Sequence, residues 1–258
     1  MPVSDTPPSL EQVLAGTDRV VEERQLESGI SGLRLGALKS VALGYGTQAG
    51  YARRAFEIRE QIQSRTRELD RLYDFQGLML DRNVLPPVLV ETASTLSMTG
   101  TDTLRLSDHT YQIVSQAKFV TAAPSWREYL MTSLTVSMGG QDLSLVPRDP
   151  SEKRFWDAQV RAGWQVGVQQ ADQVFAAQLA RLSRDYKGMV LYRHLLSLNM
   201  VSKPFVAESN LGVTGDGNQI AINDRVLRIT ALPQLETRSE QWRAKLVPAP
   251  VSSTDTNP

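Results

Sequence analysis

The side chains that could carry out chemistry are few and widely spaced in this 258-residue sequence. Its two histidines, His109 and His194, have no Asp or Glu at the spacing of a metal-binding motif. We expect His109 to face solvent in a hairpin turn, and His194, in an apolar segment, to be a hydrogen-bonded core residue. Cysteine is absent, which excludes disulfides, thiolate metal ligands and a cysteine nucleophile. The sequence therefore predicts neither a metal site nor a cofactor site.

Acidic and hydroxyl side chains give no clearer catalytic pattern. Asp81, Glu91, Asp108 and Asp224 could pair as acids in space, but turn positions explain the last two. The Gly-x-Ser-x-Gly elbow of a serine nucleophile is absent, although a dispersed Ser-His-Asp arrangement stays open. No catalytic residue is therefore predicted.

A glycine-rich stretch, Gly44–Gly50, looks superficially like a phosphate-binding loop. Its spacing differs from the dinucleotide fingerprint, no strand pattern precedes it, and no Gly-Lys-Ser/Thr follows. Gly46 and Gly50 instead lie one helical turn apart, as do Gly163 and Gly167. Small residues at this spacing let two helices approach closely, a motif best known from membranes. We therefore predict a close helix contact at these glycines and no nucleotide site.

Two long helical patterns and two hairpin patterns make up most of the chain. Apolar residues at helical spacing predict one helix over residues 37–73 and a second over 151–186. Alternating apolar and polar residues predict two β-hairpins, with turns at residues 107–109 and 223–225.

The apolar stretch 74–91 joins the first helix to the first hairpin, and it contains Pro86 and Pro87. No helix or central strand continues through such a pair, so the stretch is either a core-crossing corner or a contact surface. Several aromatic residues flank a later Pro/Gly-rich linker, where they suit a core or a protein interface. The candidate protein-interaction residues are Pro86, Pro87, Trp126, Arg127, Tyr129, Trp156 and Trp164.

The sequence contains an internal repeat. At a shift of 117 residues, Gly46–Gly50 aligns with Gly163–Gly167, and after one deletion a shift of 116 aligns Leu104 with Ile220. A repeat of this length is one supersecondary unit used twice. We therefore predict an α+β fold of two helix–proline-broken segment–β-hairpin units that pack as one domain. Its long helices would lie against a small antiparallel sheet formed by the hairpins.

Composition and charge restrict the class of protein. Basic and acidic residues number 28 each, which disfavours a large nucleic-acid footprint. No apolar run approaches the ~20 residues needed to span a bilayer. We predict an N-terminal linker with a short helix over residues 1–36 and one α+β domain over 37–246. The two repeats would occupy about 37–121 and 151–236, followed by a disordered tail over 247–258.

Three blocks carry a resemblance to a known family. They are Gly46–Gly50 with the following Arg53-Arg54, Leu80–Glu91 with its Val-Leu-Pro-Pro-Val run, and Pro124–Leu130, which reads Pro-Ser-Trp-Arg-Glu-Tyr-Leu. With these blocks, over most of residues 35–235, the chain resembles the DotC family of type IVB secretion systems. That family includes the conjugative counterparts encoded by IncI-type plasmids.

The resemblance implies a non-enzymatic lipoprotein that faces the periplasm and is held at the outer membrane by an N-terminal lipid. Family members are structural parts of a multi-copy, ring-shaped core complex and act with DotD-like and DotH-like subunits, and no direct nucleic-acid binding is expected. The lipid-bearing cysteine of such proteins is absent, so we expect that Met1 replaces a removed signal and that cysteine. The alternative hypothesis is a periplasmic cell-wall-binding or hydrolytic protein, which requires a cleft with convergent acidic or Ser/His groups.

Overall fold

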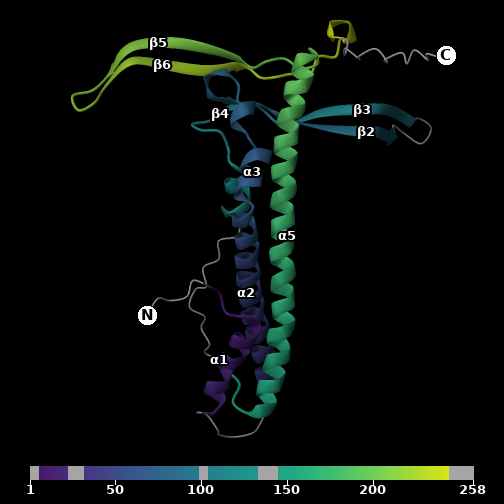
Figure 1. Cartoon of the computed structure of the whole chain (residues 1–258), viewed down its shortest axis with the longest axis vertical. Coiled ribbons are helices and arrows are strands. Elements are labelled where there is room, and N and C mark those ends of the chain that lie inside the picture. Colours follow the sequence, from purple (N-terminus) through teal and green to yellow (C-terminus); the bar gives the residue numbers. More distant parts are fainter. Residues whose placement is uncertain (1–5, 23–31, 99–103, 133–144, 244–258) are drawn as a thin grey trace, which may run out of the picture. The chain divides into compact units, whose positions relative to one another are not determined.

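The computed structural model describes residues 6–22, 32–98, 104–132 and 145–243, which form helices and two-stranded antiparallel sheets (Figure 1). The chain divides into two compact units. We call Met1–Asp74 with Ser125–Ser183 the helical unit, and Phe75–Pro124 with Arg184–Pro258 the hairpin unit. This mixed α+β architecture confirms the predicted fold class at the level of its elements.

The helical unit is built from α1, α2, α3, α4 and the first part of the long helix α5. Their bounds are Leu10–Glu22, Gly32–Ser64, Thr66–Leu72, Trp126–Leu130 and Pro150–Ser197. The helix predicted over 37–73 is thus two helices, because Arg65 leaves the helical conformation between them. Apolar side chains from α1, α2 and α5 form its core, namely Val13, Leu38, Ala42, Ala49, Trp156 and Val160.

The predicted short N-terminal helix is present and is longer than expected. Ser9 and Gln12 cap it reciprocally, because each backbone N–H bonds the other residue's side chain. Gly16 lies inside α1, which continues to Glu22. An isolated glycine inside a helix is tolerated at a cost of about 1 kcal/mol relative to alanine.

Helices α2 and α5 pack against each other through the predicted glycines, which confirms the close contact. A Cβ added at Gly46 would collide with the Val160 carbonyl, and one at Gly163 would collide with the Leu43 carbonyl. A Cβ at Gly50 would lie 2.5 Å from the Trp164 oxygen. Contacts advance in the same direction along both helices, so the helices run parallel. Leu43 and Val160 differ by the repeat shift of 117, as Gly46 and Gly163 do, so this contact is internally symmetric.

The hairpin unit contains the remainder of α5, six strands and short 3₁₀ turns. The strands β1 to β6 span Val84–Leu85, Val88–Met98, Leu104–Ser115, Lys118–Phe119, Phe205–Gly215 and Ile220–Ala231. The 3₁₀ turns η1, η2 and η4 span Gln76–Leu78, Asp81–Asn83 and Ser239–Gln241. Its core lies where the end of α5 meets the start of β2, and it consists of Leu89, Tyr192, Leu195 and Val201.

The strands lie at the offsets that the predicted repeat requires. Strand β5 begins and ends 117 residues after β2, and β6 begins and ends 116 residues after β3. The pairing follows the same rule, because Val84 opposite Phe119 corresponds to Val201 opposite Leu235. Strands and single β-bridges of the two halves thus correspond, and their description as one repeated unit stays a prediction.

The predicted turn positions of the hairpins are wrong, because the residues expected to form turns lie within strands. The alignment of the two hairpins at shifts of 117 and 116 matches the observed strands. Residues 107–109 lie within β3, where His109 is opposite Ala93 of β2. In the second copy the chain reverses after Gly215, where the Asp216 side chain accepts from the backbone of Asn218 and Gln219. Polar residues in the middle of exposed strands had the composition of turns, and this caused the error.

The prediction of one sheet shared by both hairpins is also wrong for the described residues. Strand β2 pairs with β3 and β5 pairs with β6, each as a separate two-stranded sheet. Burial along β2 ends after Leu89, so the rest of the ribbon has no buried face for a helix or a second hairpin to cover. The long helices pack on each other instead. The division into a linker, one domain and a tail stays a prediction.

Helix α5 continues beyond the predicted end near residue 186, to Ser197. Gly188 lies inside it because the β2 backbone passes there, and a Cβ would lie 2.6 Å from the Leu89 oxygen. The helix ends where Asn199 adopts a left-handed conformation and Met200 N–H bonds the Leu195 carbonyl.

Candidate protein-interaction surfaces

The outer end of the first hairpin has one apolar face. Leu96 lies opposite Leu106, and Met98 lies opposite Leu104. Side chains two residues apart on a strand share a face, so these four form one cluster, which we call the first tip face. All four are exposed, and Leu106 retains 69% of its accessible surface.

The second hairpin presents the same arrangement at its outer end. Val213 lies opposite Ile222, and Gly215 lies opposite Ile220. We call Val213, Ile220 and Ile222 the second tip face, and Ile222 is 74% exposed. The repeat shifts of 117 and 116 align its members with Leu96, Leu104 and Leu106 of the first tip face.

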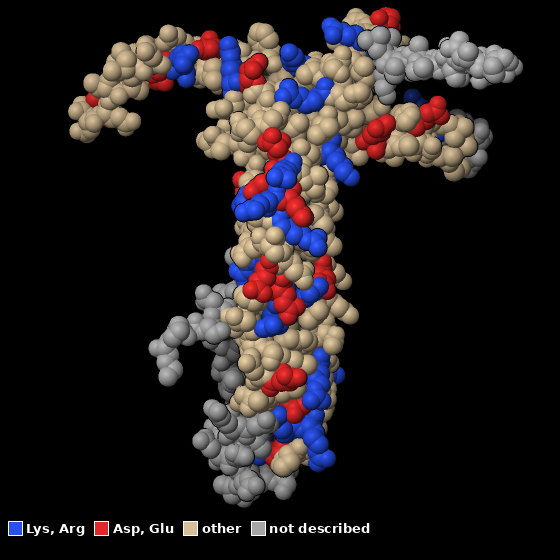
Figure 2. Space-filling model, viewed as in Figure 1, with Lys and Arg blue, Asp and Glu red and all other residues tan. Residues whose placement is uncertain are grey.

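The opposite faces of the two outer ends are polar. The Thr95 hydroxyl bonds the Thr110 hydroxyl at 2.6 Å, and Thr214 donates to Asp224 at 2.6 Å. Figure 2 shows the outer ends of both hairpins as largely uncharged surface. An isolated two-stranded hairpin is marginally stable in water, and exposed apolar clusters with polar surroundings mark contact sites.

Nearer the helix, each hairpin has one cross-strand ion pair at equivalent positions. His109 Nδ1 lies 2.8 Å from Glu91 Oε1, and Arg225 Nη1 lies 3.1 Å from Glu208 Oε1. Tyr111 also donates to Glu91 at 3.1 Å. Burial, and secondarily the Glu91 hydrogen bond, raises the pKa of Tyr111. Such exposed pairs contribute little free energy, but polar partners across the ribbon help to set its register.

The proline candidates lie inside the hairpin unit. Pro86 and Pro87 are buried between β1 and β2, next to the buried side chains of Leu85 and Val88. Their interaction role stays a prediction, but in this conformation they form the corner that turns the chain into β2 rather than a surface.

The Trp126–Arg127 pair anchors α4 to α3 in the helical unit. Trp126 is buried, and its indole N–H donates to Asp70 at 2.7 Å. Arg127 lies over the Trp126 ring at 4.3 Å and donates to both Asp70 oxygens. Hydrogen bonds from Arg127 and then Trp126 lower the pKa of the Asp70 carboxyl. Of this pair, only Arg127 is exposed to a partner.

The remaining aromatic candidates also contact their own unit. Tyr129 is half-buried, with the Arg181 guanidinium 5.6 Å from its ring. Trp156 is fully buried near Tyr45, and its indole N–H has no partner among the described residues. Trp164 is half-buried where its backbone meets Gly50.

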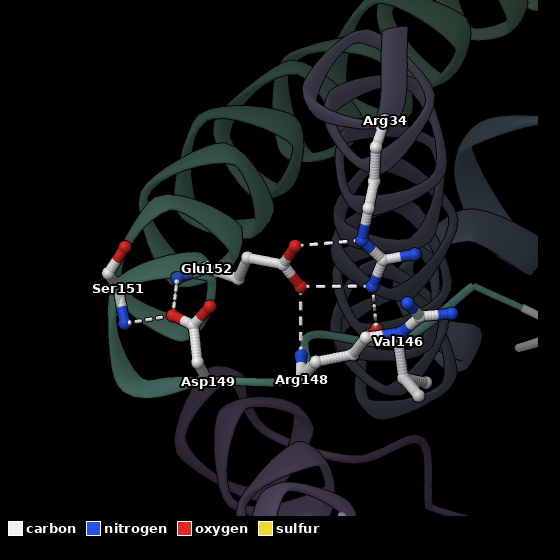
Figure 3. A network of polar contacts seen from close by, with 6 residues as sticks. All are labelled: Arg34, Val146, Arg148, Asp149, Ser151 and Glu152. Atoms are coloured by element: carbon white, nitrogen blue, oxygen red, sulfur yellow. Dashed lines mark hydrogen bonds and ion pairs between the residues drawn. The ribbon is translucent and has the colours of Figure 1, made fainter. Parts of the chain in front are cut away.

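An ion pair between the half-buried Arg34 and the buried Glu152 secures the beginning of α5 (Figure 3). Arg34 donates through Nε and Nη2 to the two Glu152 oxygens, at 2.7 and 3.0 Å. Arg148 N–H also donates to Glu152 at 2.9 Å, and Arg34 reaches the Val146 carbonyl at 3.2 Å. The Arg34 hydrogen bond holds the pKa of the Glu152 carboxyl below its ordinary value.

Asp149 completes this network as the cap of α5. Its carboxylate accepts from the backbone N–H groups of Ser151 and Glu152, at 2.7 and 2.8 Å. The hydrogen bond to Glu152 is the main cause that lowers the pKa of Asp149. Because both Glu152 oxygens and one Asp149 oxygen bond to groups of the same unit, the arrangement serves to hold the helices rather than to bind a substrate.

Of the sequence-predicted acids and histidines, the described residues bring Glu91 and His109 together, as the exposed cross-strand pair of the first hairpin, and they place no further member of that set beside it. His194 is exposed rather than buried, which corrects that expectation, and Asp224 is engaged by Thr214. In the described part of the chain, no group of three His, Asp or Glu side chains has the geometry of a metal site. Sequence reasoning missed the tip faces, although apolar residues at equivalent positions of both repeats were the available signal.

The sequence matches the model of a known protein family. Residues 32–244 match the profile of the family described as "Type IV secretory system, conjugal DNA-protein transfer". No curated protein matches the sequence. Within the described ranges, no helix combines the length and apolar character needed to cross a membrane.

Proposed function

Since the chain belongs to the type IV secretory system family of conjugal DNA–protein transfer, we propose that it is a structural subunit of that system's core complex. Membership makes it a component of a type IV secretion or conjugal transfer system. The finer role is to place and hold partner subunits at the outer membrane, from the periplasmic side, in a multi-copy ring. The partners are subunits like DotD and DotH.

The two equivalent tip faces carry this proposal. Each combines adjacent exposed apolar side chains with an opposite polar face, and the same positions are apolar in both repeats. A solitary exposed leucine is common on protein surfaces, but a paired cluster on a two-stranded ribbon is not. A scaffold subunit with two such arms can contact two neighbours without any catalytic group.

The hairpins also suit assembly through their backbone. The outer edges of β2, β3, β5 and β6 have no strand partner among the described residues. Unpaired strand edges are templates for a strand from another chain, and apolar side chains on one face then give specificity. The contact we propose therefore combines edge pairing with burial of the tip face.

Co-purification tests this role. The protein is co-expressed with the DotD-like and DotH-like subunits of its own transfer system, and the recovered complex is quantified. Leu106→Ser together with Ile222→Ser removes one side chain from each tip face. We expect this variant to lose most of the complex while its melting temperature stays unchanged, since both side chains are exposed.

A matched control variant tests whether assembly depends on the tip faces or on any residue at the hairpin ends. Arg105→Ser with Ala221→Ser alters exposed residues at the same outer ends but on the polar faces. It is expected to assemble normally. Full assembly of the Leu106/Ile222 variant would refute the role of the tip faces, and failure of the unaltered protein to associate would refute the subunit assignment.

A further inference from the structure

A basic cleft lies in the hairpin unit where α5 ends. Its volume is about 930 Å³, and it is lined by the last turn of α5, the segment after it, and Gln234–Arg238 with Gln241 and Arg243. A second cleft of about 500 Å³ shares Arg193, Leu196 and Lys203 with it, so the two adjoin. Neither cleft contains the tip faces.

The charge of the larger cleft is strongly unbalanced. Its lining has four cationic residues, Arg193, Lys203, Arg238 and Arg243, against the single carboxylate of Glu236. Arg238 engages both Glu236 oxygens, at 2.9 and 3.0 Å, and this pairing lowers the pKa of Glu236 to about 2. The Glu236 carboxylate is therefore ionised and already neutralised by its neighbour.

Three cations of the larger cleft remain for a ligand. Arg193, Lys203 and Arg243 have no acidic side chain within ion-pair distance among the described residues. Arg193 is oriented by a hydrogen bond to the Gly77 carbonyl at 2.8 Å. In the adjoining cleft Arg82 is bound to Glu208 at 3.4 Å, and Asp81 supplies a carboxylate. The excess of positive charge thus belongs to the larger cleft.

Apolar side chains lie among these cations. Leu196, Val201 and Leu235 line the same cleft, and Val201 and Leu235 form a β-bridge beneath it. A site that combines separate cations with apolar contacts fits a polypeptide whose acidic and apolar side chains alternate. A nucleic-acid strand would call for a basic stripe and stacking aromatics, and the lining of this cleft has no aromatic residue.

We propose that this cleft is a docking site for an acidic segment of another polypeptide. The inference rests on the proposed function only in that the segment belongs to a neighbouring subunit. Because the cations are exposed, the attraction is screened by salt: the Debye length falls from about 30 Å at 0.01 M to about 10 Å at 0.1 M ionic strength.

A titration of the full chain alone tests the cleft directly. The probe is a fluorescently labelled peptide of alternating Glu and Leu, measured by anisotropy, and the reference is the same peptide with Gln in place of Glu. We expect the Glu peptide to bind more tightly than the Gln peptide and to lose this advantage as salt is raised. Lys203→Gln with Arg243→Gln is expected to weaken Glu-peptide binding about tenfold.

Matched charge variants make the test specific. Arg105→Gln with Arg228→Gln removes the same charge from exposed hairpin positions outside the cleft, and it is expected to leave binding unchanged. Equal weakening by both double variants, or equal binding of the Glu and Gln peptides, would overturn the proposal. So would a single-stranded oligonucleotide that binds as tightly as the Glu peptide and loses affinity in the Lys203/Arg243 variant.

The titration is independent of the assembly experiment. If the unaltered protein binds the Glu peptide but does not co-purify with the DotD-like and DotH-like subunits, the subunit role is refuted and the acidic-peptide site remains. Normal co-purification without peptide binding would retain the subunit role and remove the cleft as a docking site.

Discussion

Alanine substitutions at two glycines of α2 should change the free energy of unfolding in opposite directions. Gly44 and Gly50 lie in the same helix, but only Gly50 meets another backbone. A Cβ at Gly44 has no heavy atom within 4 Å, whereas a Cβ at Gly50 lies 2.5 Å from the Trp164 oxygen and 2.9 Å from its Cα. These atoms belong to the α5 backbone, so no side-chain rotation relieves the clash.

The size of each stability change follows from two opposing effects, the helix propensity gained by alanine and the clash of its Cβ with the neighbouring helix. Alanine gains about 1 kcal/mol over glycine in a helix interior, so Gly44→Ala is expected to stabilise by about 0.5–1 kcal/mol. At Gly50 the helices must separate by roughly 1 Å to restore ordinary van der Waals contact, which forfeits dispersion along the seam. Overpacking of this kind costs about 1–3 kcal/mol. Gly50→Ala therefore loses stability overall, and Gly50→Val loses more.

Thermal unfolding followed by helical circular dichroism measures the difference. A change of 1 kcal/mol shifts the melting temperature by about 2–4 °C for a chain of this size. We expect Gly44→Ala to melt slightly above the unaltered protein, and Gly50→Ala to melt below it. Gly167→Ala, the equivalent position in the repeat, should behave like Gly50→Ala, because its Cβ would lie 2.7 Å from Tyr51 N. If Gly50→Ala stabilised the protein as Gly44→Ala does, the interlocked glycine contact would be wrong.

Three further substitutions test other parts of the structure. Glu152→Gln should cost about 1–3 kcal/mol at neutral pH because it leaves the half-buried Arg34 without its ion-pair partner. Since the folded-state pKa of Glu152 is lowered, its ionised carboxylate stabilises the fold fully above the ordinary carboxyl pKa, and this contribution fades as pH falls through the lowered value. Glu152→Gln should therefore flatten the fall of the melting temperature in acid. An unchanged acid profile would contradict this. Pro87→Ala should lower the melting temperature or the yield of complex rather than any turnover, and it is refuted by normal values of both. Gly188→Ala should lower the melting temperature because of the Leu89 backbone, and a gain in stability would count against the described packing of β2 on α5.

The duplication could be read directly from the sequence. Glycines and prolines occupy backbone positions that other residues tolerate poorly, so the alignment of Gly46 with Gly163 marks the repeat pattern even where neighbouring residues differ. The same logic predicted the helix contact, because small residues one turn apart leave room for a second backbone. The family blocks around Pro86 and Trp126 also lay in the sequence, and the family match to residues 32–244 confirmed the type IV secretion family that they indicated.

Strand pairing and burial were decided by the tertiary structure. A run such as Ser107–His109 has the composition of a turn, and only its pairing with β2 shows that it continues a strand. Trp126 and Trp156 were equally compatible with an interface or a core until their neighbours placed them inside the helical unit.

The candidate surfaces depended on the tertiary structure for the same reason. Local pattern specifies which residues are apolar, but exposure depends on contacts between residues far apart in the chain. Leu106 and Ile222 have the alternation of strand residues that would face a core, and no other described element covers them. Arg193 and Arg243 are 50 residues apart, and the cleft that unites them exists only because the chain returns past the end of α5.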